Sequence, residues 1–106
     1  MEENNTMPEI ITLCGSTKFK DKFMEVARKL TLKGKIVILP GVFGHADNEP
    51  ITPEQKRMLD DLHLRKIDMS NSIYVINSNG YIGESTMKEI EYAKKHEKKI
   101  MYHTDN

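Results

Sequence analysis

The sequence has no second cysteine, no excess of basic residues and no long apolar run, and each absence argues against a class of protein. It has one cysteine, Cys14, so no disulfide can form within the chain, which suits a reducing cytoplasm. Its 16 basic residues balance its 16 acidic ones, and this balance disfavours binding to DNA or RNA. No apolar run approaches the ~20 residues of a membrane span, and the acidic start is unlike a signal peptide. We therefore expect a cytoplasmic protein whose partners include no nucleic-acid polymer and no membrane.

What remains is the composition of a small globular domain. The chain has 106 residues, of which 38% are hydrophobic and 30% are charged. A domain of this size can bury a core without disulfides or a structural metal. We expect residues 1–7 to form a disordered tail and residues 8–106 to form one domain.

Apolar periodicity predicts four strands that alternate with three helices. Short apolar runs predict buried strands over 10–13, 36–39, 73–76 and 99–102. Helical spacing predicts one helix over about 18–32, a second that begins at Thr52 with a capping box to Gln55, and a third over about 86–96. The buried positions expected in the last two helices are Met58, Leu59, Leu62, Met87, Ile90 and Ala93.

This alternation predicts an α/β fold. We expect a small three-layer, Rossmann-like (flavodoxin-like) parallel sheet with strand order 2-1-3-4 and right-handed crossovers. Ligands of such sheets bind beyond the carboxyl ends of the strands, at the switch point between strands 1 and 3. The loops after Leu13, Leu39 and Ile76 should meet at that edge.

The loop Gly15–Ser16–Thr17 follows the first predicted strand. Gly15 allows close approach of the backbone, and the hydroxyls and free amides of a helix start can hold an anion. The simpler interpretation is that Ser16 or Thr17 only caps the helix. The position at the switch point favours a substrate-binding role for all three residues.

The loop over residues 41–51 is long enough to suggest a function. Phe43 could stack on a base, or it could pin the loop to the core. His45 and Asp47 lack a third clustered ligand, and a strand cysteine such as Cys14 is usually a small buried hydrophobe. We therefore expect no metal site and no cofactor.

The segment over 83–93 carries the candidate for catalysis. Gly83, Ser85 and Thr86 open the third predicted helix at the ligand edge, and Glu89 lies one turn inside. A carboxylate there could attack a sugar carbon and form a covalent glycosyl intermediate. Thr86 and Glu89 also have capping-box spacing, and from spacing alone the capping role is favoured.

Two motifs resemble the nucleoside 2-deoxyribosyltransferase family, including relatives that hydrolyse 2′-deoxynucleoside 5′-monophosphates. The motifs are ITLCGSTKF at 11–19 and Thr-x-x-Glu-Ile-x-Tyr-Ala at 86–93. The resemblance covers nearly the whole chain after Pro8. It implies that Glu89 is the nucleophile, that Ser85 and Thr86 contact sugar or phosphate, and that the first loop lines the same pocket.

The sequence departs from the family pattern at two aspartates. Many relatives carry one of them six residues before the nucleophile, where this chain has Gly83. The other falls at His63 or Leu64, and either Asp60 or His63 could take its catalytic role. Some relatives complete the pocket with a C-terminal residue of a neighbouring subunit, a contribution that we do not expect here. The resemblance implies a homodimer.

Two functions follow from these patterns. The first is cleavage of the N-glycosidic bond of a nucleoside or nucleoside 5′-monophosphate through the Glu89 nucleophile, by hydrolysis or by deoxyribosyl transfer, with hydrolysis favoured. The second is a non-catalytic module that binds or senses a nucleotide in the same pocket.

Overall fold

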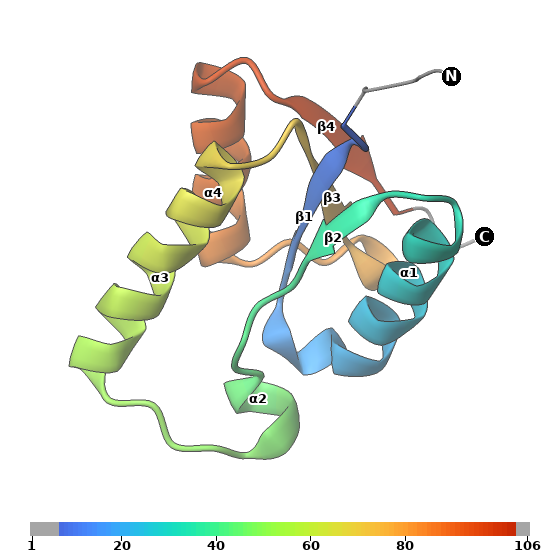
Figure 1. Cartoon of the computed structure of the whole chain (residues 1–106). Helices are drawn as coiled ribbons and strands as arrows, with labels where there is room; N and C mark the ends of the chain where they lie inside the picture. The colour runs from blue at the N-terminus through green and yellow to red at the C-terminus, as the bar shows by residue number, and fades with distance from the viewer. Residues whose placement is uncertain (1–6, 104–106) are drawn as a thin grey trace, which may run out of the picture.

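The structure is a computed structural model that describes residues 7–103 (Figure 1). Its centre is a sheet of four parallel strands: β1 (Ile10–Gly15), β2 (Ile36–Ile38), β3 (Ser72–Ile76) and β4 (Lys99–Tyr102). Their order is β2-β1-β3-β4, so the predicted α/β fold and the predicted strand order are confirmed. Of the predicted N-terminal tail, residues 1–6 lie outside the described residues.

Helices cover the two faces of the sheet and make three layers. Helix α1 (Lys20–Leu32) packs on one face, and helices α3 (Pro53–Asp68) and α4 (Glu84–Lys95) pack on the other (Figure 1). Side chains of β1 alternate between these faces, as strand geometry requires. Leu13 joins the core under α1, whereas Cys14 joins the core under α3 and α4.

Helix α3 begins as predicted, but its buried face differs from the prediction. The Thr52 hydroxyl accepts a hydrogen bond from the Gln55 amide at 3.1 Å, and the Gln55 side chain accepts one from the Thr52 amide at 3.0 Å. Met58 and Leu62, which we predicted to be buried, are 54% and 46% exposed. The first turns of α3 project beyond the end of the sheet, so only its C-terminal half packs on strands (Figure 1).

Helix α4 begins two residues earlier than predicted. Its N-cap is Gly83, and its buried residues are Thr86, Ile90 and Ala93, which recur at helical spacing. Met87, which we predicted to be buried, is instead 48% exposed. The buried face of α4 therefore contains Thr86 in place of Met87. The earlier start of the helix also changes the position of Glu89 relative to the N-cap.

The segment between β2 and α3 is folded over the sheet edge. It contains the short helix α2 (Gly44–Asp47), which the ion pair between Lys20 and Asp47 ties to α1 at 2.9 Å. Phe43 is buried and meets the Phe23 ring edge-on, with ring centroids 5.3 Å apart. Within residues 7–103, none of the helices has the length and apolar character needed to span a membrane.

Candidate functional site

A cavity of about 590 Å³ opens at the carboxyl end of β1. Its walls come from the turn after β1, the segment around α2, helix α3 and the start of α4. This is the edge of the sheet at which the strand order predicts a ligand site. Nine predicted site residues line it: Gly15, Ser16, Thr17, Asp60, His63, Gly83, Ser85, Thr86 and Glu89.

Phe43 is the predicted site residue that does not line this cavity. Its ring packs on Phe23 in the core under α1, which is the second of the two roles considered for it. The structure therefore gives Phe43 a role in anchoring the 41–51 segment, and the prediction that it stacks on a base is not supported.

The last residue of β1, Gly15, lies close to the backbone of β3. Gly15 has a φ of +152°, and a Cβ at this position would lie 2.8 Å from the Ile76 carbonyl oxygen. Ser16 then caps a 3-10 turn, η1 (Thr17–Phe19), by accepting a hydrogen bond from the Lys18 amide at 3.4 Å. The predicted capping role of Ser16 is confirmed, and the same turn forms part of the cavity wall.

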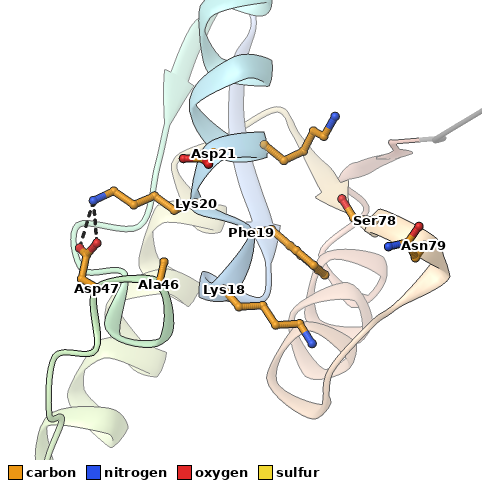
Figure 2. A pocket seen from close by; sticks show the side chains of 9 residues that line it. Lys18, Phe19, Lys20, Asp21, Ala46, Asp47, Ser78 and Asn79 are labelled. Carbon is orange, nitrogen blue, oxygen red and sulfur yellow. Dashed lines mark hydrogen bonds and ion pairs between the residues drawn. The ribbon is translucent and has the colours of Figure 1, made fainter.

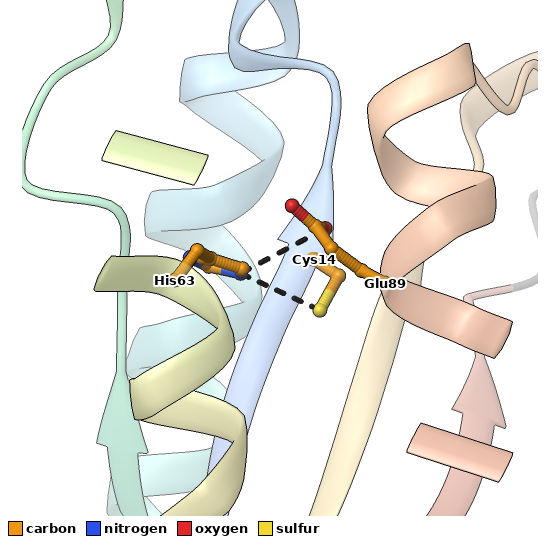
Figure 3. Close-up of side chains that lie close together, drawn as sticks. All are labelled: Cys14, His63 and Glu89. Atoms are coloured by element: carbon orange, nitrogen blue, oxygen red, sulfur yellow. Dashed lines mark hydrogen bonds and ion pairs between the residues drawn. The ribbon is translucent and has the colours of Figure 1, made fainter. Parts of the chain in front are cut away.

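Glu89 lies on the floor of the cavity and does not cap its helix. Helix α4 starts at Glu84 with Gly83 as its N-cap, so Glu89 is on the second turn, beyond reach of the first orphan amides. The capping-box interpretation of Thr86 and Glu89 is therefore wrong. Figure 3 shows the Glu89 side chain directed from α4 toward β1 and α3.

Three side chains from three separate elements meet below the cavity (Figure 3). Nε2 of His63, on α3, lies 3.5 Å from Sγ of Cys14, on β1, and 3.8 Å from Oε1 of Glu89, on α4. Cys14 and Glu89 also act on each other: the thiol lowers the pKa of the Glu89 carboxyl, and the carboxylate raises the pKa of the Cys14 thiol. The three possible ligand atoms all lie within 4.8 Å of one another, so this group could hold a metal ion, a site that we did not predict.

Burial controls the charges of this group. It raises the pKa of the Glu89 carboxyl to about 7, because the ionised form loses hydration. It lowers the pKa of the His63 imidazole to about 4, so the ring is neutral at pH 7. It also raises the pKa of the Cys14 thiol well above its ordinary value. At neutral pH, Glu89 is thus poised between a carboxylic acid and a carboxylate.

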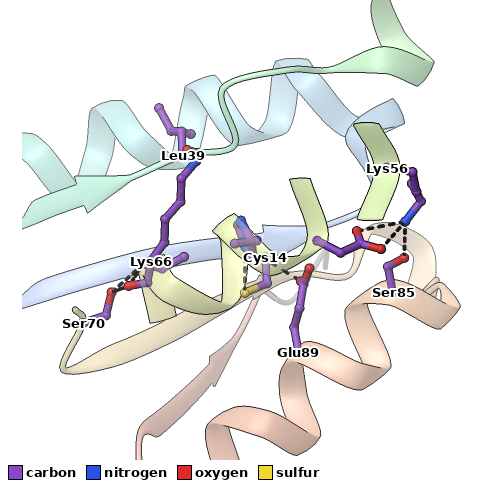
Figure 4. Close-up of polar contacts among 10 residues, drawn as sticks. Cys14, Leu39, Lys56, Lys66, Ser70, Ser85 and Glu89 are labelled. Carbon is purple, nitrogen blue, oxygen red and sulfur yellow. Dashed lines mark hydrogen bonds and ion pairs between the residues drawn. The ribbon is translucent and has the colours of Figure 1, made fainter. Parts of the chain in front are cut away.

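A lysine and an aspartate form the polar mouth of the cavity (Figure 4). Lys56 Nζ contacts the two Asp60 carboxylate oxygens at 2.9 and 2.8 Å and donates to the Ser85 hydroxyl at 3.0 Å. The side chains of Lys56 and Asp60 are 54% and 52% exposed, so water reaches both. This cluster joins α3 to the start of α4 and presents a cation next to the Ser85 hydroxyl.

A second lysine lies deeper on the same helix. Lys66 donates to the Leu39 carbonyl oxygen at 2.9 Å and lines the cavity (Figure 4). Burial lowers the pKa of its ammonium group. Sequence analysis missed Lys56, Lys66 and the approach of Cys14 to Glu89, since lysines on a helix usually face solvent. The signal that could have found Cys14 is the two-residue alternation of β1.

A more open pocket of about 700 Å³ lies on the other side of η1 (Figure 2). It is lined by Lys18, Phe19, Lys20, Asp21, Lys22, Ala46, Asp47, Ser78 and Asn79. Lys20 is already paired with Asp47, and Lys18 lies 3.8 Å from the centroid of the Tyr81 ring. None of the predicted catalytic residues lines this pocket, so we assign the candidate site to the cavity that contains Glu89.

Asp68, at the end of α3, does not line this cavity. It accepts a hydrogen bond from the Tyr92 hydroxyl at 2.6 Å and pairs with Arg65 at 2.9 Å. The hydrogen bond from Tyr92 joins α4 to α3, and the Arg65 pair lies within α3, so the role of Asp68 is structural.

No family model matches the chain, and no curated protein sequence matches it. The resemblance of its two motifs to the nucleoside 2-deoxyribosyltransferase family therefore stays a prediction. The functional assignment depends on the geometry of the cavity.

Proposed function

We propose that this protein cleaves the N-glycosidic bond of a nucleoside or nucleoside 5′-monophosphate, with Glu89 as the nucleophile. The observation that carries the proposal is the position of Glu89: a carboxyl group on the floor of a cavity, with no capping role and a pKa of about 7. A perturbed carboxyl in a cleft is typical of a catalytic group. The role agrees with the resemblance of the 86–93 motif.

The reaction needs one bond to break and another to form at each step. A Glu89 carboxylate oxygen bonds to the anomeric carbon, and the base leaves with the electrons of the C–N bond and takes a proton from solvent. Water then attacks the anomeric carbon of the glycosyl ester, the C–O bond to Glu89 breaks, and the sugar leaves with a new hydroxyl while one proton of the water passes to solvent; Glu89 returns as a carboxylate. Hydrolysis is favoured over transfer because water reaches the mouth of the cavity, where the side chains of Lys56 and Asp60 are half exposed.

The direct test is incubation of the protein with a panel of nucleosides and nucleoside 5′-monophosphates, with free base measured by chromatography. Release of base from one class of substrate supports the proposal. Binding of nucleotides without release of any base would instead support the second candidate, a non-catalytic nucleotide-binding module. The observation that favours this second candidate is the departure from the family pattern at Gly83 and His63, where many of the resembled relatives carry aspartates.

Base release should depend on pH through the ionisation of Glu89. In buffer that contains a chelator, we expect the rate to rise about tenfold per pH unit well below pH 7 and to level off above it. The neighbours of Glu89 do not titrate near pH 7: His63 is neutral above about pH 4, and Cys14 stays a thiol. The charges of Asp60 and Lys56 act on Glu89 in opposite directions.

The matched variant for this profile is Cys14→Ala. It removes the thiol, which lowers the pKa of Glu89, so the midpoint of the pH–rate profile should move to higher pH. A rate that is constant between pH 5 and pH 8 in the wild type would exclude Glu89 as the nucleophile.

Lys56 should distinguish phosphorylated substrates from nucleosides. If its ammonium group and the Ser85 hydroxyl meet a 5′-phosphate, Lys56→Gln should raise KM for the monophosphate by roughly tenfold while kcat changes little. Lys88→Gln is the control, because Lys88 is an exposed lysine on α4 that does not line the cavity. Equal effects on a nucleoside and on its monophosphate would show that Lys56 does not contact phosphate.

A further inference from the structure

The Cys14–His63–Glu89 group has the ligand types of a zinc site. A thiolate, an imidazole and a carboxylate are three common zinc ligands, and catalytic zinc sites use three protein ligands with one position open. The three side chains come from β1, α3 and α4, so the packed fold brings their ligand atoms within 4.8 Å of one another. Rigid elements of this kind hold ligands more precisely than loops do.

The distances fit the coordination geometry of zinc. Tetrahedral Zn²⁺ with ordinary bond lengths places a sulfur and a nitrogen ligand about 3.5 Å apart, and a nitrogen and an oxygen ligand about 3.4 Å apart. The Cys14 Sγ to His63 Nε2 distance is 3.5 Å, and the His63 Nε2 to Glu89 Oε1 distance is 3.8 Å. A small rotation of the Glu89 carboxylate closes the remaining difference.

The charge of the group also fits a divalent cation. Cys14 is fully buried, and the side chains of His63 and Glu89 are 10% and 14% exposed. Two anionic ligands would be costly to bury alone. One Zn²⁺ neutralises a thiolate and a carboxylate, and the bound form of the site therefore has no net charge.

We propose that Cys14, His63 and Glu89 bind one Zn²⁺ ion on the cavity floor, with the fourth coordination position facing the cavity. Binding forms a Zn–S, a Zn–N and a Zn–O bond, and the thiol proton leaves to solvent, as does the carboxyl proton where it is present. Metal binding is independent of the proposed function. Its consequence rests on that function: a Glu89 carboxylate that ligates zinc cannot attack a sugar, so zinc inhibits base release.

Spectroscopy with Co²⁺ as a substitute for zinc tests the site without reference to activity. The chelator-treated protein should bind one equivalent of Co²⁺ and acquire a thiolate-to-cobalt charge-transfer band together with the visible bands of a tetrahedral ion, and Zn²⁺ should displace both. Calorimetric titration with Zn²⁺ should give the same stoichiometry. Cys14→Ser and Glu89→Gln should each weaken Zn²⁺ by at least about 100-fold, since losing a group that merely orients a ligand costs about 10- to 100-fold.

The matched control is His45→Ala, which removes a histidine that lines the same cavity but lies outside the cluster. This variant should bind Zn²⁺ as the wild type does. Absence of the charge-transfer band in the folded wild type, or equal Zn²⁺ affinity in Cys14→Ser, overturns the metal site. Zinc binding without inhibition of base release, in a wild type that does release base, overturns the inhibition alone.

Discussion

Glu89→Gln should abolish base release and at the same time make the folded protein more stable above pH 7. A neutral amide cannot attack the anomeric carbon and leave again as a carboxylate. Loss of a nucleophile in other enzymes lowers kcat by as much as about 10⁶-fold, and we expect at least about 10³-fold here. Gln has nearly the same shape as Glu, so ligand binding should persist.

The gain in stability follows from the sign of the pKa change. Burial raises the pKa of Glu89 from an ordinary 4.5 to about 7, so folding favours the protonated form. Wild-type stability is therefore lost as pH rises from about 4.5 through 7, by about 3 kcal/mol in total. Gln carries no proton to lose, and the variant keeps its free energy of unfolding where the wild type loses it.

The measurements are base release, nucleotide affinity and urea unfolding at pH 5 and pH 8 for the wild type, Glu89→Gln and Glu91→Gln. Glu91 is an exposed glutamate on the same helix that does not line the cavity, so its variant should match the wild type in all three. If Glu89→Gln released base at the wild-type rate, the nucleophile would be another group. If it were less stable than the wild type at both pH values, Glu89 would have a structural role that its place on α4 does not explain.

Gly15→Ala should destabilise the fold more than any other glycine substitution in the cavity wall. Its φ of +152° disfavours any side chain, and the new Cβ would lie 2.8 Å from the Ile76 carbonyl oxygen and 3.3 Å from Cζ of Phe23. Those two neighbours belong to the packed core and cannot move freely. Strain and steric overlap together should cost about 3 kcal/mol or more of unfolding free energy.

Substitutions at two other glycines distinguish the cost of a positive φ from the cost of steric overlap. Gly34 also has a positive φ, +87°, but open space around its Cβ position, so Gly34→Ala should cost only about 1 kcal/mol. Gly41→Ala meets neither obstacle and should change the unfolding free energy by less than about 0.5 kcal/mol. Chemical denaturation of the three variants measures the series. Equal costs at Gly15 and Gly34 would mean that β1 and β3 separate readily at this point.

The sheet and the ligand edge could be predicted because their signals are local. Apolar runs at β1 and β3 and helical spacing between them determine a parallel order, and that order places the turn after Leu13 beside the loop after Ile76. The residues of the cavity wall follow from this topology. Phe43 was ambiguous because a loop aromatic near glycines suits both a ligand and a core.

The cluster on the cavity floor could be predicted only in part. His63 and Glu89 were both candidate catalytic residues, but their approach to Cys14 depends on how the helices rotate about their axes. Cys14 precedes His63 by 49 residues in the sequence, and the rotation of α3 alone decides whether His63 faces inward. Met58 and Leu62 predicted a different buried face of α3. Helical spacing in the sequence does not show which turns of a helix pack on the sheet and which extend beyond its end. The spacing of Thr86 and Glu89 predicted a capping box that does not form, because the N-cap of α4 is Gly83.

The strand order also has a consequence for synthesis of the chain on the ribosome. Strand β1 is made early, but its neighbour β3 follows more than fifty residues later, and Glu89 lies later still. A nascent chain that ends before residue 72 has one edge of β1 unpaired and the Cys14 side of that strand uncovered by α4. The cavity floor therefore assembles only as the last quarter of the protein emerges, so binding and completion of the fold should appear together during translation.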